Sequence, residues 1–336
     1  MIEYAIARLA ALKSRFVTSE SLQRLLLTKD HRTLAAALSE SVFREEMDSL
    51  MVKGEGDPSP AALLRLIHEG HARLRLFFSG LVKSAYPALF DSILARWELE
   101  EIKAGLRYLS SRGPTLERRF RFTSYFADPK ETRSWGECKT VREFFSILVK
   151  KNHPMAAFID IELFGKDQVR AEGEMERRFF TGYFAVNKSA SPLRQYFSRR
   201  MDAVNIHVAL LMRDHPIDSL EMRERFLEGP GTISFADFQA LAKTPSLREA
   251  VDIVKKRLGL SLGPSAEESP ARLSTHLQKS FFHQYKKNRL LEPGGLWAFL
   301  FFMEALDAMV EDLKLALYFR AAGVPPQEAE IHFITA

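Results

Sequence analysis

The sequence predicts an all-α fold, and three observations support this prediction. Hydrophobic residues recur every three or four positions along nearly the whole chain, which is the spacing of one helix face. Sustained alternation of apolar and polar residues, the pattern of a half-buried strand, is nowhere long enough for a sheet. The chain has only 17 glycines and 15 prolines among 336 residues, which disfavours both a turn-rich all-β fold and a disordered chain.

The first helices follow directly from this spacing. Ile2, Ile6, Leu9 and Phe16 lie on one face of a helix that covers the start of the chain, with Leu12 or Lys13 completing the face. Two leucine groups then predict two further helices, one through Leu22, Leu25 and Leu26 and one through Leu34 and Leu38.

Serine–proline pairs mark later helix starts, at 59–60, 191–192 and 269–270. A serine hydroxyl can cap the first turn, and a proline there loses no hydrogen bond because its N–H would have no helical partner. Breaks between helices are predicted where glycine and proline cluster, at 53–60, 110–114, 227–231 and 258–270.

A repeated pattern divides the chain into similar parts. Phenylalanine pairs begin at Phe77, Phe179 and Phe281, at equal intervals of 102 residues, and continue as FFSGL, FFTGY and FFHQY. A proline follows each pair, and then a segment of matching chemistry: RWELEEIKAGLR, RMDAVNIHVALLMR and MVEDLKLALYFR. Such self-similarity is the signature of internal repeats.

These three segments align on the hydrophobic anchors Ile102, Ile206 and Leu313. An acid or amide precedes each anchor, a base follows it, and a leucine lies four residues later. The anchor and that leucine share one helix stripe, so we expect both to be buried and the polar neighbours to fan out to its two flanks. The phenylalanine pairs are expected in the core as well.

We therefore predict three tandem helical repeats, over residues 1–115, 116–225 and 226–336, with linkers at 110–136 and 214–232. Three similar units can pack cyclically into a pseudo-threefold arrangement. An open stack of units is the competing arrangement.

Composition excludes several classes of protein. Cys138 is the only cysteine, so the chain can form no internal disulfide and no zinc site built on two or four cysteines. The longest apolar uncharged stretch, Pro293–Met303, is far shorter than the ~20 residues of a spanning helix. The net charge of +5 neither demands nor excludes an anionic partner. The sequence thus favours a soluble or peripheral protein on the cytosolic side of a membrane.

Candidate chemical groups are few. The HEGH segment, with His68, Glu69 and His71, has two imidazoles within reach of one helix face but no evident third metal ligand, so a solvated helix face is the favoured interpretation. Cys138 lies in a predicted linker without an evident base, which disfavours catalysis. Phosphate-binding GxxxxGK loops and GxSxG elbows do not occur. We predict no catalytic residue, no metal site and no cofactor.

Three further segments have two interpretations each. Arg118, Arg119 and Arg121 alternate with Phe120 and Phe122, which fits an amphipathic linker better than a nucleic-acid patch. Lys286, Lys287 and Arg289 are expected to be solvated, although near a membrane they could meet headgroups. The aromatics of GGLWAFLFFME are expected first in the core, with contact to a proteolipid ring or to lipid as the alternative for Trp297, Phe299 and Phe302.

Several segments together resemble a known family. ARLAALKSRFVTSESLQRLLL is similar to that family's opening helix pair, and RWELEEIKAGLR and MDAVNIHVALLMR resemble its first two repeat-ending helices. VEDLKLALYFRAAGVPPQE resembles its C-terminal signature, although Asp312, like Glu101 in the first copy, stands where asparagine is usual. The family is the C subunit of V-type and A-type rotary ATPases, called subunit d in eukaryotes, and the resemblance covers essentially the whole chain.

The resemblance implies a non-catalytic part of a rotary motor. Family members form a three-lobed helical funnel that sits on the cytoplasmic end of the membrane proteolipid ring. The central cavity of the funnel receives the tip of the rotor shaft, an asymmetric coiled coil made of the D and F subunits. It therefore implies these partners, a peripheral position on the membrane and one copy per complex, with no nucleic acid. The alternatives are a free-standing helical adaptor on the same scaffold and a nucleic-acid-binding helical protein, since fold does not fix function.

Overall fold

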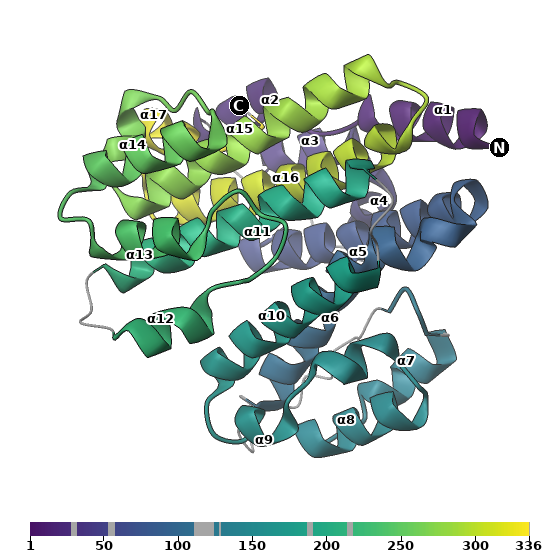
Figure 1. Cartoon of the computed structure of the whole chain (residues 1–336). Helices are drawn as coiled ribbons and strands as arrows, with labels where there is room; N and C mark the ends of the chain where they lie inside the picture. Colours follow the sequence, from purple (N-terminus) through teal and green to yellow (C-terminus); the bar gives the residue numbers. More distant parts are fainter. Residues whose placement is uncertain are drawn as a thin grey trace. The chain divides into compact units, whose positions relative to one another are not determined.

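The computed structural model describes residues 1–27, 32–52, 58–110, 124–127, 129–186, 191–213 and 218–335, and in these ranges every regular element is a helix (Figure 1). The all-α prediction is confirmed. The chain forms two compact units: unit 1 comprises residues 1–87 and 247–336, and unit 2 comprises residues 88–246.

Unit 1 is built from both ends of the chain. Its first part contains α1 (Ile2–Lys13), α2 (Ser19–Leu27), α3 (Arg32–Ser39), α4 (Arg44–Val52) and α5 (Pro60–Ala85). Its second part contains α14 (Leu247–Leu258), the short 3₁₀ turn η3 (Pro264–Glu267), α15 (Pro270–Leu291), α16 (Leu296–Ala321) and α17 (Pro326–Glu330). In Figure 1 the purple α2 and the yellow α16 lie in the same unit, and the two helices are in contact.

Helix α16 is the centre of unit 1. It contacts α1, α2, α5, α15 and α17, and 17 of its 26 residues are buried. Burial on nearly all sides explains why GGLWAFLFFME carries aromatics on more than one face. Trp297, Phe299 and Phe302 are 4%, 0% and 2% exposed, so the core alternative describes these side chains. The alternative, that these side chains contact a proteolipid ring or lipid, stays a prediction, and their burial does not support it.

Unit 2 contains the middle of the chain. Its helices are α6 (Phe90–Ser110), α7 (Pro129–Trp135), α8 (Val141–Lys150), η2 (Pro154–Phe158), α9 (Ile161–Phe164), α10 (Gln168–Val186), α11 (Ser191–Met212), α12 (Ser219–Arg225) and α13 (Phe235–Lys243). A further 3₁₀ turn, η1 (Pro87–Leu89), lies at the boundary of the units. Two of these helices, α7 and α12, fall inside the segments predicted as linkers.

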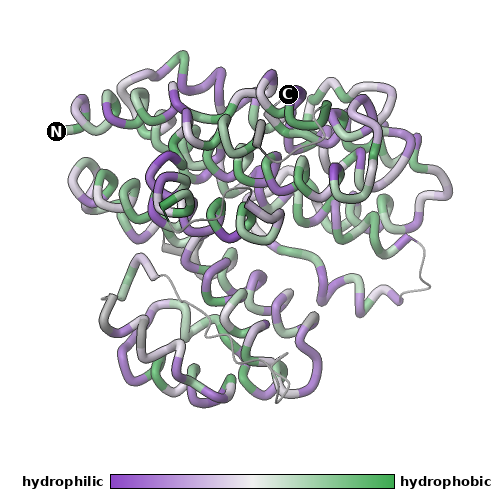
Figure 2. Tube along the Cα trace, turned by 180° about the vertical axis from the view of Figure 1, so that it is seen from behind, coloured by the Kyte–Doolittle hydropathy of each residue, from purple (hydrophilic) through white to green (hydrophobic). Residues whose placement is uncertain are grey.

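The predicted helix starts are found in the structure. The Ser59 hydroxyl accepts the N–H of Ala62 at the start of α5, and the Ser269 hydroxyl accepts the N–H of Arg272 at the start of α15. In both helices a proline follows the capping serine, as a first-turn proline should. Along the helices of both units, hydrophobic and hydrophilic stretches alternate, as amphipathic packing requires (Figure 2).

The residues chosen as repeat markers lie at corresponding places along the chain. Each phenylalanine pair is on the first of two successive long helices, α5, α10 or α15, and each anchor is on the second, α6, α11 or α16. The anchors Ile102, Ile206 and Leu313 are fully buried, and Phe179 and Phe281 are buried too. Phe77 is only half-buried, and its neighbour Phe78 occupies the core instead. The division into three tandem repeats remains a prediction, because the two compact units describe packing and do not superpose the copies.

Candidate functional site

The HEGH segment lies on α5 and forms a contact within unit 1. His71 is buried, and its Nε2 lies 2.9 Å from Oδ1 of Asp307 on α16, where the Arg75 guanidinium also binds at 3.1 Å. Burial, reinforced by the positive charge of Arg75, lowers the pKa of His71 to about 4, although Asp307 opposes the shift. A neutral imidazole that donates to Asp307 therefore joins α5 to α16. Over the described ranges, the structure has no group of three or more side chains that could hold a metal ion.

A serine, a histidine and a glutamate meet in the core of unit 2. Glu98 Oε1 accepts the Ser124 hydroxyl at 2.7 Å and lies 2.8 Å from His153 Nε2, and its Oε2 accepts the N–H of Tyr125 at 2.7 Å. Nucleophilic catalysis needs the histidine between the serine and the acid. Here Ser124 and His153 both bind the Glu98 carboxylate, and the Ser124 hydroxyl accepts the N–H groups of Phe126 and Ala127, so this geometry is not catalytic. We call such a buried side chain, which holds a later segment of the chain by hydrogen bonds, a clamp.

The same type of clamp recurs on the other two long helices that carry anchors. Asp202 on α11 accepts the N–H groups of Thr232 and Ile233 at 3.0 and 2.9 Å. Asp312 on α16 accepts the N–H groups of Ile334 and Thr335 at 2.7 and 2.9 Å, and also the Thr335 hydroxyl. In each case a buried carboxylate holds the backbone of a segment more than twenty residues further along the chain.

The clamps occupy two positions relative to the anchors. Glu98 and Asp202 lie four residues before their anchors, whereas Asn205 and Asp312 lie one residue before theirs. Asn205 accepts the N–H of Leu227 at 2.8 Å and donates to its carbonyl at 3.0 Å, so α11 holds its following segment twice. The expectation that the polar residues beside the anchors occupy the flanks is wrong for three of them: Asn205 and Asp312 are fully buried because they pair with backbone, and Lys103 is 5% exposed because it pairs with Glu176.

Burial has an electrostatic consequence for two of the clamps. Desolvation raises the pKa of Asp202 and of Asp312 above the ordinary value of a carboxyl, and the backbone N–H groups that they accept oppose this shift. The loop over Asp202 also passes very close to it, because a Cβ added at Gly231 would lie 2.6 Å from Asp202 Oδ1. Glycine at this position lets the backbone reach the carboxylate.

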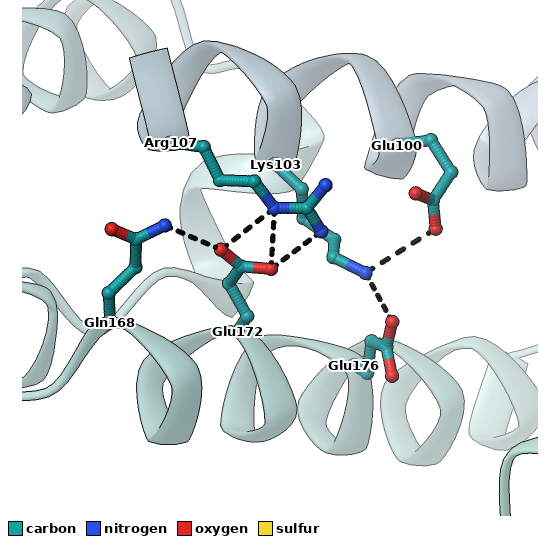
Figure 3. Close-up of polar contacts among 6 residues, drawn as sticks. All are labelled: Glu100, Lys103, Arg107, Gln168, Glu172 and Glu176. Atoms are coloured by element: carbon teal, nitrogen blue, oxygen red, sulfur yellow. Dashed lines mark hydrogen bonds and ion pairs between the residues drawn. The ribbon is translucent and has the colours of Figure 1, made fainter. Parts of the chain in front are cut away.

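Ion pairs join α6 to α10 in unit 2 (Figure 3). Arg107 donates through Nε and a terminal nitrogen to both oxygens of Glu172, at 2.6 to 2.9 Å, and Gln168 supports that glutamate. Lys103 is 5% exposed and binds Glu176 and, at 3.4 Å, Glu100. Burial alone would lower the pKa of Lys103, but the two glutamates outweigh it and the pKa is raised.

A cleft of about 1330 Å³ lies beside these helices within unit 2, among α9, α10, α11 and α12. Its apolar lining includes Val204, Val208 and Leu211 of α11, and Leu211 is 56% exposed. Its charged lining is largely paired internally, as in Arg170 with Glu224 at 2.7 Å. An apolar strip with charged margins of both signs can take an amphipathic helix.

Comparison with known proteins decides the family. The family model described as ATP synthase (C/AC39) subunit matches residues 5–330, nearly the whole chain. The chain belongs to this family. The resemblance found in the sequence is thereby confirmed, and with it a role as a subunit of a V/A-type rotary ATPase. The curated proteins contain no match to the chain.

The structure also bears on the remaining candidates in this C/AC39 family member. Cys138 is 5% exposed, and burial together with Glu143 raises the pKa of its thiol, so a reactive thiolate is disfavoured. None of the helices, as far as the chain is described, is long and apolar enough to cross a membrane. The residues of the basic–aromatic segment lie outside the described ranges: Arg118, Arg119, Phe120, Arg121 and Phe122.

Proposed function

We propose that the chain is the non-catalytic central-stalk socket subunit of a V/A-type rotary ATPase. It joins the D–F rotor shaft to the membrane proteolipid ring, so that proton or sodium transport is coupled to ATP chemistry in other subunits. The family match over residues 5–330 carries this proposal. We further propose that it lies peripherally on the cytoplasmic face of the membrane, as one copy in the complex, without cofactor or nucleic acid.

The buried clamps support a mechanical role. A subunit that transmits torque must keep its helices and connecting segments from yielding under load. Glu98, Asp202 and Asp312 each attach a later segment to a long helix through hydrogen bonds to a buried carboxylate. Such bonds to charged groups contribute about 1.5–3 kcal/mol, more than neutral ones, so they resist local opening.

In addition to the central cavity that the resemblance implies, we assign a contact with the shaft to the cleft of unit 2. The shaft is helical according to the resemblance, and an amphipathic helix is the occupant that suits an apolar strip with paired charges on both sides. Leu211 presents the most exposed large apolar side chain of that strip. Its burial by a partner helix would remove an apolar group from water at little electrostatic cost.

Binding of the purified chain to a purified D–F subcomplex, measured by calorimetry, tests this assignment. We expect binding, and we expect Leu211→Glu to weaken it because the variant places a charge on the apolar strip. Leu76→Glu is the matched control, since Leu76 is 46% exposed on α5 of unit 1, outside the cleft. Equal loss in both variants would overturn the assignment to the cleft.

If the chain binds neither the shaft nor the proteolipid ring, the proposed function itself is overturned. A free-standing adaptor would then be the better interpretation. A titration with RNA and DNA separates the third alternative, because nucleic-acid binding would weaken steeply with salt.

A further inference from the structure

Three basic side chains gather in unit 1 where α1 ends and α15 ends. Lys13 Nζ lies 5.1 Å from the centre of the Phe301 ring, and the Arg289 guanidinium carbon lies 5.6 Å from the same centre. Lys286 is one turn before Arg289 on α15. The repulsion from Arg289 and Lys286 adds to burial in lowering the pKa of Lys13, which shows that these charges act on one another.

These cations have no acidic partner among the described residues. No ion pair joins Lys13, Lys286, Lys287 or Arg289 to any carboxylate that the structure describes. Some other basic side chains of the same unit are paired, as in Arg73 with Glu46 and Lys314 with Glu311. Like charges at this spacing repel one another, and an anion from outside would relieve that repulsion.

Two exposed leucines complete the surface. Leu290 and Leu291 are the last two residues of α15 and are 68% and 72% exposed. The exposed Glu292 and Pro293 follow in the short turn to α16. The leucines therefore lie at the C-terminal end of α15, directly after Arg289, and line none of the three clefts around Leu12, Leu211 and Cys138.

We propose that this basic–leucine patch, formed by Lys13, Lys286, Lys287, Arg289, Leu290 and Leu291, docks on an anionic lipid surface. The cations bind headgroup phosphates and the two leucines enter the boundary between headgroups and acyl chains. The C-terminal end of α15 thus carries cations and exposed leucines together, a combination that suits a plane of anionic headgroups. The contact is additional to the proposed attachment to the shaft and ring, and it does not depend on them.

Flotation of the purified full chain with vesicles tests the proposal. We expect binding to phosphatidylcholine vesicles that contain phosphatidylglycerol, loss of that binding at high salt, and little binding to phosphatidylcholine alone. Lys286→Gln with Arg289→Gln should weaken binding about 30-fold, from about 1 kcal/mol for each basic side chain near the surface. Leu290→Ser with Leu291→Ser should weaken it too, with the salt dependence unchanged.

The matched control is Lys255→Gln with Lys256→Gln on α14, which removes the same charge from a surface without exposed leucines. An equal loss of vesicle binding in this control would mean that net charge alone drives binding, and would overturn the proposed role of the patch.

Unchanged vesicle binding in the patch variants would overturn the lipid proposal too. If they bind vesicles normally but fail to bind an acidic partner subunit, the patch is a protein contact and the lipid proposal is overturned. A wild-type chain that floats with anionic vesicles but binds no shaft would overturn the proposed function and leave this proposal intact.

Discussion

The centre of unit 1 and the α6–α10 interface of unit 2 are held together by different forces. In unit 1, α16 is buried on almost all sides by apolar neighbours, with Phe78 stacked on Phe302 at 5.5 Å. In unit 2, Lys103 and Arg107 of α6 reach acidic residues of α10 across the interface (Figure 3). Apolar packing is nearly independent of salt, whereas the partly exposed Arg107–Glu172 pair is screened by it. The two units should therefore respond differently to truncation, pH and ionic strength.

Truncation of the unit 1 core should have the largest effect. Phe78→Ala is expected to lower the free energy of unfolding by about 3–5 kcal/mol, because a fully buried ring leaves a cavity. Phe77→Ala is the matched control, since the adjacent half-buried ring should cost less than half as much. Denaturant titration of both variants measures the difference. Equal losses of unfolding free energy in the two variants would contradict the assignment of Phe78, and not Phe77, to the core.

Acid should destabilise unit 1 through His71. Its pKa in the folded protein is about 4, below the ordinary 6.5, so the folded state resists protonation. The stabilisation is complete above pH 6.5 and is lost as pH falls through about 4, by up to about 3 kcal/mol. In a urea titration series, His71→Gln should flatten the pH dependence over this window. An unchanged slope would show that the imidazole titrates normally.

The clamps of the two units should contribute similarly, despite their different surroundings. Asp202→Ala in unit 2 leaves the N–H groups of Thr232 and Ile233 without an acceptor, and Asp312→Ala does the same for Ile334 and Thr335 in unit 1. Each variant should lose about 2 kcal/mol. Hydrogen exchange at these amides, compared with Asp202→Asn, reports the local effect. If these amides exchange in the alanine variants at the same rates as in the wild type, the carboxylates do not hold the segments in place.

The smallest effect is expected at the exposed end of the α6–α10 interface. Arg107→Gln should cost under about 1 kcal/mol, because the Arg107 side chain is 48% exposed and its bond to Glu172 competes with water. The cost should shrink further at high salt. Thermal melts at low and high ionic strength measure it. A large loss that salt does not alter would indicate that packing, and not charge, dominates this interface too.

The sequence predicts the local features of this molecule well. The helical class, the serine caps before Pro60 and Pro270, and the burial of the anchors all depend on residues within a few turns of one another. Local spacing fixes helix faces, so these features can be inferred from one chain. The sequence does not predict the short helices α7 and α12, because their hydrophobic patterns are weak and lie inside segments rich in turn residues.

The long-range features could not be inferred in the same way. A clamp such as Asp202 binds backbone N–H groups, which every residue except proline carries, so its partner leaves no side-chain signature. For Asn205 and Asp312 the sequence does carry a signal, the acid or amide that precedes each anchor, although its interpretation as a helix flank misses the backbone partner; Glu98 and Asp202 lie outside this pattern. The packing of α2 against α16 likewise joins two ends of the chain that no periodicity connects.

Affinity capture of the tagged chain from its native membranes, followed by identification of the captured subunits, tests the central claim most directly. The proposed role predicts that the D and F shaft subunits and the proteolipid come with it in constant proportion. Recovery of the chain without shaft and proteolipid, from membranes in which the rotary ATPase is intact, would contradict it.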